Sequence, residues 1–157
     1  MLRSGLVRSY AGWSRPPDRA GRFVLPARVS VQLVLKVVDS AVRPPEFAHG
    51  VRSGYSVIDG GCAPSYVEVE LSPLGAFRLF GTPMDRLAGQ LVDLVDVLGR
   101  PARQLGSIVR DSPSWRERFG AIDRCLLGRL GDAPPVAPEV ALAWRQLVTS
   151  RGTVTWP

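Results

Sequence analysis

The periodicity of the sequence changes abruptly within residues 66–81, which read YVEVELSPLGAFRLFG. Up to Leu71 every second residue is aliphatic, and this alternation is typical of a strand with one buried face. After Pro73 the apolar residues are crowded at a helix-like spacing, which predicts a short helix. The junction therefore predicts an α+β fold, in which an antiparallel β-rich half over residues 29–73 precedes a helical half over residues 74–151.

The clearest strand pattern lies in the stretch RVSVQLVLKVVD, where alternate residues form one apolar face. That face consists of Val29, Val31, Leu33, Leu35 and Val37. It predicts a central strand of about nine residues. Pro44 and Pro45 cannot extend the strand, because proline lacks the amide donor that a sheet ladder requires. Further short strands are expected at residues 47–51, 55–58 and 66–71.

Start and stop signals predict the helices of the second half. Thr82 as N-cap and Pro83 as first residue predict a helix that continues to Gly99. A second helix is expected in RPARQLGSIVRD, and a third begins with Ser112 as its cap and Pro113 as its first residue. The last helix, in PEVALAWRQLVTSRG, is expected to stop at a glycine and to bury one apolar face. The inward residues of this helix are predicted to be Val140, Trp144, Leu147 and Val148.

The third of these helices carries an apolar stripe at intervals of three and four residues, which is typical of an amphipathic helix. The stripe consists of Trp115, Phe119, Ile122, Leu126 and Leu130. Two interpretations are open. The stripe packs against the β half and the other helices of this chain, or it forms a dimerisation seam between two subunits.

The composition indicates one globular domain, since the chain has 157 residues of which 45% are hydrophobic. No apolar run approaches the roughly 20 residues that a membrane helix needs, and the first ten residues lack the apolar core of a secretory signal. Cys62 and Cys125 are far apart in the sequence and predict reduced thiols. We therefore expect a cytoplasmic protein that has no membrane partner.

Most of the net charge of +6 lies in residues 1–28, which hold six arginines and one acid. This segment is predicted to be a basic N-terminal arm and a lead-in to the first strand. In one interpretation the arm is merely solvated. In the other it binds nucleic acid without sequence specificity, with Tyr10 and Trp13 lying among arginines that contact phosphates.

The sequence offers no pattern for catalysis or for metal binding. His49 is the single histidine, whereas a zinc or cupin-type metal site needs about three protein ligands. Glu46 could supply one more ligand at best, and a Ser-His-Asp set with Asp59 lacks an elbow motif to place the nucleophile. No phosphate-binding glycine loop is present. We predict no catalytic residue, no metal and no cofactor, with a small enzyme kept as an alternative.

The segment VEVELSPLGAFRLFGTPMDRLAGQLVDLVDVLG resembles the N-terminal domain of AraC-type transcriptional regulators, particularly those of high-GC actinobacteria. The positions that carry the resemblance are Leu71, Pro73, Gly75, Ala76, Leu79, Gly81, Pro83, Leu87, Asp93, Leu94, Val97, Leu98 and Gly99. The two later stretches SWRERFGAIDRCLLGRL and PEVALAWRQLVTSRGTV also resemble the helices that follow in this family. The likeness covers roughly residues 23–154.

The resemblance implies a cupin-like β half, as a partial barrel or sandwich, that serves effector sensing and dimerisation. It also implies that residues 152–157 are the truncated start of a DNA-binding region with two helix-turn-helix units, which the chain lacks. DNA would then be reached only through that absent region or a partner chain. The expected partners are a second copy and a small-molecule effector. The effector would lie inside the β half, between the inward faces of residues 29–37 and 67–71. Gln32, Tyr55 and Tyr66 are the residues expected to orient it.

Overall fold

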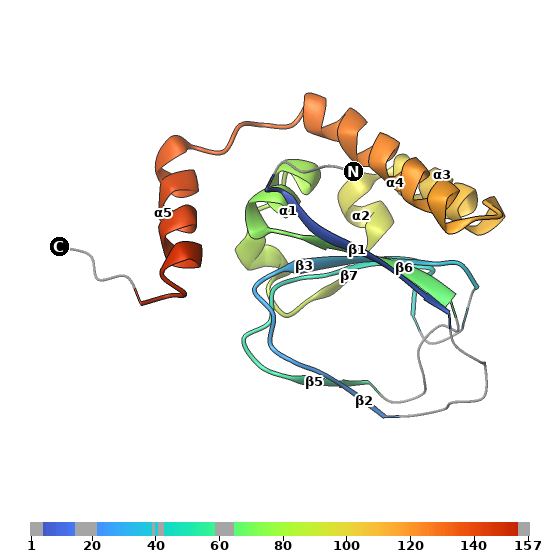
Figure 1. Cartoon of the computed structure of the whole chain (residues 1–157), viewed down its shortest axis with the longest axis horizontal. Helices are drawn as coiled ribbons and strands as arrows, with labels where there is room; N and C mark the ends of the chain where they lie inside the picture. The colour runs from blue at the N-terminus through green and yellow to red at the C-terminus, as the bar shows by residue number, and fades with distance from the viewer. Residues whose placement is uncertain (1–4, 15–21, 39, 41–42, 59–64, 154–157) are drawn as a thin grey trace.

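The computed structural model describes residues 5–14, 22–38, 40, 43–58 and 65–153. It confirms the α+β class: an antiparallel sheet comes mainly from the N-terminal half, and helices follow in the C-terminal half (Figure 1). The main sheet has five strands in the order β1-β6-β3-β4-β7, and β2 pairs with β5 in a separate two-stranded sheet. The strands are β1 (Val7–Ser14), β2 (Phe23–Leu25), β3 (Val31–Lys36), β4 (Glu46–His49), β5 (Ser56–Ile58), β6 (Ser65–Leu71) and β7 (Leu91–Asp93).

The helices cover one face of the main sheet, and the β2–β5 pair lies on the other side of it (Figure 1). The covered face is built from the alternating aliphatic residues of β3 and β6. In the strand register Val31 lies opposite Leu71, Leu33 opposite Val69 and Leu35 opposite Val67. All six side chains are at most 1% exposed and belong to a single apolar core shared with the helices. The predicted alternation is confirmed for Val31, Leu33 and Leu35, since a strand turns every second side chain to the same face. The predicted length of about nine residues is wrong, because β3 has six residues, and Val29 lies before it and is 65% exposed.

The strand β1 corrects the prediction that residues 1–28 are only an arm and lead-in. Val7–Ser14 pairs antiparallel with β6 along the edge of the main sheet. Tyr10 faces helix α4 (Trp115–Gly131), where its hydroxyl donates to Oδ1 of Asp123 at 2.6 Å. A Cβ atom on Gly12 would lie 2.7 Å from the indole ring of Trp115, so the strand and the helix are in close contact. Alternate residues of β1 pack on α4. The arginines in this segment interrupt the apolar pattern that would otherwise predict a strand from the sequence.

The junction between the alternating and the helix-like pattern is the start of helix α1 (Pro73–Phe80). Ser72 is its N-cap, and the hydroxyl oxygen of Ser72 accepts a hydrogen bond from the amide of Gly75 at 3.1 Å. The amide of Ser72 also donates to the carbonyl of Leu6 at 2.8 Å, next to the start of β1. The strand β6 therefore ends at Leu71, because the following residue, Ser72, caps helix α1 and bonds to the segment before β1.

The prediction of one long helix from Thr82 to Gly99 is wrong. The segment contains a 3₁₀ helix η1 (Met84–Leu87), the strand β7 and a short helix α2 (Leu94–Leu98). Gly89 adopts a left-handed conformation with φ +68°, which interrupts a helix. Asp93 then caps α2 by accepting from the amide of Val95 at 2.9 Å. Tertiary pairing of β7 with β4 overrides the helical pattern here.

Helix α3 (Arg100–Asp111) agrees with the prediction, whereas α4 begins two residues later than predicted. Its cap is Ser114, which accepts from the amide of Glu117 at 3.3 Å, and Ser112 instead ends α3. Within the stripe, Ile122 and Leu126 are fully buried in the core of this chain, and Leu130 is nearly so. Trp115 and Phe119 are partly buried and stack on each other, with ring centroids 6.2 Å apart.

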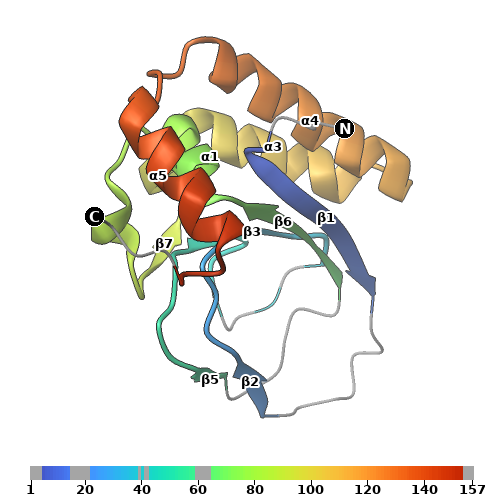
Figure 2. The same cartoon turned by 60° about the vertical axis from the view of Figure 1, so that its left-hand side comes forward.

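The final helix α5 (Pro138–Thr149) stands apart from the other four helices (Figure 1). Figure 2 views the molecule from the side on which α5 lies. None of its residues is buried. Four of its apolar side chains are at least 40% exposed: Val140, Leu142, Leu147 and Val148. The prediction that α5 buries an apolar face is therefore wrong within this chain, because the preceding proline-containing segment carries the helix away from the core. The helix does end as expected, near Gly152 with φ +81°.

Candidate functional site

Polar side chains gather on the face of the main sheet that the helices leave open. They occupy the strand positions that alternate with the core residues. Gln32 of β3 lies opposite Glu70 of β6 on one side and opposite His49 of β4 on the other. Glu68 lies one pleat further along β6 and accepts a hydrogen bond from Nε2 of Gln32 at 2.7 Å. The same alternation that builds the core thus lines this face with hydrogen-bonding groups.

Arg52 lies at the centre of this polar group and is only 6% exposed. Its backbone forms an isolated bridge with Arg28, with hydrogen bonds of 3.0 and 2.8 Å. Its guanidinium donates twice to Oε1 of Gln32, both at 3.2 Å, and its Nη1 lies 2.6 Å from Nδ1 of His49. A weaker contact joins Nη2 to the carbonyl of Pro26 at 3.4 Å. Among the described residues, Nε of Arg52 is buried without a partner, and every acceptor of the guanidinium is uncharged.

His49 must be neutral to make its contact with Arg52. A guanidinium can only donate hydrogen bonds, so Nδ1 of His49 accepts and the ring proton sits on Nε2. Burial, together with the positive charges of Arg52 and Arg43, lowers the pKa of His49 from its ordinary value of 6.5 to about 4. This histidine is 7% exposed. It therefore serves to orient Arg52 and is a poor proton donor near neutral pH.

We expect acid to destabilise the fold through His49. The unfolded chain binds a proton at this residue below pH 6.5, while the folded chain does so only near pH 4. Stability is therefore lost as the pH falls through this window, by about 2 kcal/mol between pH 7 and pH 5. Urea unfolding at the two pH values measures the difference. His49 is the single histidine, so a His49→Gln variant should lose most of the pH dependence; an equal loss in parent and variant would contradict the assignment.

A shallow cleft of about 450 Å³ opens beside this polar group. It lies where β1 and β3 begin and β6 ends, next to the segments that lead to the two-stranded sheet. Its lining residues are Arg8, Ala27, Arg28, Val29, Ser30, Arg52, Ser53 and Glu70. The cleft therefore combines three guanidinium groups with two hydroxyls and a small apolar surface.

Two glutamates partly balance the arginines of the cleft. Nε of Arg8 lies 3.8 Å from Glu70, and Nη1 of Arg28 lies 3.6 Å from Glu68, so both pairs are ion pairs at distances too long for a hydrogen bond. Burial would raise the pKa of Glu70, but hydrogen bonds from Ser30 and Ser9 and the nearby arginines hold it below its ordinary value. Glu70 is consequently charged at neutral pH.

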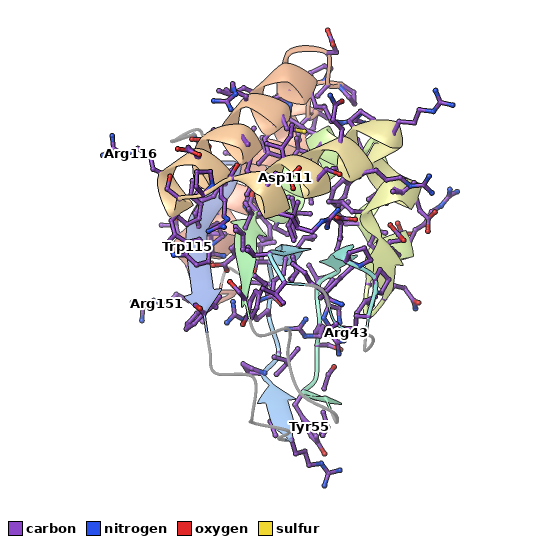
Figure 3. All side chains as sticks on the ribbon, turned by 90° about the vertical axis from the view of Figure 1, so that its right-hand side faces the viewer. Arg43, Tyr55, Asp111, Trp115, Arg116 and Arg151 are labelled. Atoms are coloured by element: carbon purple, nitrogen blue, oxygen red, sulfur yellow. The ribbon has the colours of Figure 1, made fainter. Side chains whose placement is uncertain are left out.

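The three residues expected to orient an effector do not lie together. Gln32 is in the polar group and holds Arg52. Tyr66 is on the same face, but it lies at the opposite end of the sheet, stacked on Trp13 with ring centroids 6.4 Å apart. Tyr55 is 74% exposed beside β5 and points away from the main sheet (Figure 3). The prediction of a pocket between the inward faces of residues 29–37 and 67–71 is also wrong, because apolar side chains of the helices fill that space.

The functional residues that sequence reasoning missed are Arg28 and Arg52. The strands β3 and β4 lie between them in the sequence, and neither arginine stands in a recognisable motif. The isolated backbone bridge between them brings the two residues to one cleft. The excess of arginine in residues 1–28 is the usable signal, since Arg8 and Arg28 of this segment both line the cleft. Tyr10 and Trp13 are engaged by Asp123 and Tyr66, whereas Arg3 and Arg15 lie outside the described residues.

Glu46 and His49 point to opposite faces of β4, so they do not form a pair. Glu46 is 4% exposed on the helix side, where it forms an ion pair with Arg110 of α3. Within the described ranges, no three His, Cys, Asp or Glu side chains cluster in a way that could hold a metal ion. Asp59 and Cys62 lie outside those ranges. Cys125 of α4 forms no disulfide, and burial raises the pKa of its thiol.

Comparisons with family models, with curated proteins and with solved structures found no match for this chain. The resemblance to AraC-type regulators therefore stays a prediction from the sequence. Across the part of the chain that the structure describes, no helix combines the length and the apolar character required to cross a membrane.

Proposed function

We propose that the chain is the effector-sensing and dimerisation module of an AraC-type transcriptional regulator, with no catalytic role. The observation that carries the sensing part is the arginine-lined cleft above the buried group of Arg52, Gln32 and His49. Fixed polar groups at the rim of a concave surface are typical of small-molecule sites. The proposal assigns this cleft, rather than the sheet interior, to the effector.

The exposed apolar side chains of α5 support the dimerisation part. Val140 and Val148 are each about half exposed, and they lie on one side of a helix with no buried residue. Exposed apolar surface of this kind is typical of an interface. The inner residues of the α4 stripe do not serve this purpose, since Ile122 and Leu126 are buried within the chain. We therefore propose α5 as the helix that meets a second copy.

A variant that fills the cleft tests the sensing function without assuming the chemistry of the effector. Ser53 is exposed and lines the cleft, so Ser53→Trp should block it while leaving the core unchanged. A ligand that binds the folded state raises the unfolding temperature, and a concentration of 100 times Kd stabilises by about 2.7 kcal/mol. We expect one class among sugars, polyols, amino acids, carboxylates and nucleosides to raise the unfolding temperature of the parent and not that of Ser53→Trp.

Ser107→Trp is the matched control, because Ser107 is an exposed residue of α3 on the helical side. This variant should respond as the parent does. The sensing proposal fails if no class of compound raises the unfolding temperature of the parent, or if every compound that does so raises that of Ser53→Trp equally. Light scattering on the same samples tests the second part, and a strictly monomeric protein at high concentration would contradict dimerisation.

A further inference from the structure

The charges around the cleft do not cancel. Arg8 faces Glu70 and Arg28 faces Glu68, which leaves Arg52 without a carboxylate within ion-pair distance among the described residues. Buried charges in proteins are ordinarily paired, because removing an ion from water without a counter-charge is costly. The floor of the cleft thus holds an excess positive charge that a bound anion would balance.

The rim of the cleft offers the donors that an anion requires. The side chains of Arg8 and Arg28 are 46% and 38% exposed, so solvent reaches both guanidinium groups. Their glutamate partners lie beyond hydrogen-bond distance, at 3.8 and 3.6 Å, and leave the planar N–H groups available for a closer acceptor. Guanidinium groups bind carboxylates in a bidentate manner. Arg52 lies beneath them, fixed by Gln32 and His49.

We infer that the cleft binds a small organic monocarboxylate, held by Arg28 and Arg8 above the buried charge of Arg52. This inference rests on the proposed sensing function and names the class of its effector. The three guanidinium groups of the cleft exceed the two carboxylates beside them by one positive charge, which matches one negative charge on the ligand. Glu70 lines the same cleft and disfavours a dianion such as phosphate. Ala27 and Val29 offer an apolar surface for the body of the ligand, and the exposed Ser53 offers a hydroxyl.

The test uses the full chain at low ionic strength with defined probes. Butanoate, 3-methylbutanoate and phenylacetate are each compared with the corresponding primary amide, and inorganic phosphate is included. We expect a carboxylate to raise the unfolding temperature and its amide to leave it unchanged. Calorimetric titration should show that Arg28→Gln weakens this binding about tenfold, the loss expected for one hydrogen bond to a charged group.

Arg8→Gln provides a second exposed variant in case Arg28→Gln unfolds through its backbone bridge to Arg52. Arg116→Gln is the matched control, since Arg116 is an exposed residue that projects from α4 away from the sheet (Figure 3). It should bind the carboxylate as the parent does. The inference is overturned when amides bind as well as carboxylates, when phosphate binds more tightly, when neither cleft variant weakens binding, or when no carboxylate binds. If a neutral compound binds the parent but not Ser53→Trp, the sensing function stands and the inference that the ligand is a carboxylate is refuted.

Discussion

Leu126→Ala is expected to lower the free energy of unfolding by about 2–5 kcal/mol, the usual cost of a large cavity in a packed core. Leu126 of α4 is fully buried and packs in the apolar core shared by the main sheet and the helices. The removed atoms leave a space that helices α1 and α3, which pack against α4, cannot fill without moving. Urea unfolding followed by circular dichroism measures the loss.

The adjacent residue supplies the control. Leu127 is 53% exposed, so Leu127→Ala removes the same atoms from the surface and should change stability by less than about 1 kcal/mol. The pair also separates the two interpretations of the α4 stripe. Replacing a core residue lowers the free energy of unfolding and leaves the monomer–dimer equilibrium of the folded protein unchanged, whereas replacing a residue at a subunit seam also shifts that equilibrium, which light scattering measures. Equal effects of the two substitutions would contradict the burial described for Leu126.

Gly50→Ala should destabilise the protein by about 3 kcal/mol, at the upper end of the range for overpacking. A Cβ atom at Gly50 would lie 1.7 Å from the carbonyl oxygen of Leu87, a backbone atom at the end of η1. The two segments cannot separate easily, because the amide of Gly50 donates to the carbonyl of Gln90 at 3.0 Å. For a chain of this size the loss corresponds to about 6–12 °C in Tm, measured by calorimetry.

Gly54→Ala controls for the general effect of replacing glycine in this region. No atom lies within 4 Å of a Cβ built at Gly54, and its backbone is not left-handed, so the substitution should be nearly neutral. A Gly50→Ala variant as stable as Gly54→Ala would show that η1 moves away at little cost. The close contact between β4 and η1 would then not position β7.

The elements predicted well from the sequence were those whose pattern reflects burial against the core of the same chain. Leu33 and Val69 alternate cleanly because helices cover one face of their strands only, and this alternation is visible without coordinates. The sequence pattern did not predict the secondary structure of segments whose conformation depends on a partner far away in the sequence. Leu91 forms β7 because it reaches β4, and Tyr10 forms part of β1 because it reaches Asp123 of α4. Neither contact leaves a local signature.

The candidate site was the least predictable part for the same reason. Gln32 is expected from the sequence to orient an effector, and in the structure it holds Arg52, the central side chain of the site. Arg52 lies in a turn-like stretch that predicts only an exposed loop, yet the bridge to Arg28 buries it. A backbone bridge between two isolated residues has no periodicity, so sequence patterns cannot indicate which arginine becomes buried.

The position of β1 at the edge of the main sheet has a consequence for folding during synthesis. Its partner β6 begins about 50 residues after β1 ends, so the first strand leaves the ribosome long before it can pair. At translation rates of about 5–20 residues per second, the delay is roughly 3–10 s. The interval is long compared with the microseconds in which local hairpins form. The nascent chain must therefore avoid aggregating through the unpaired strand β1 until Leu71 has been added and β6 can pair with β1.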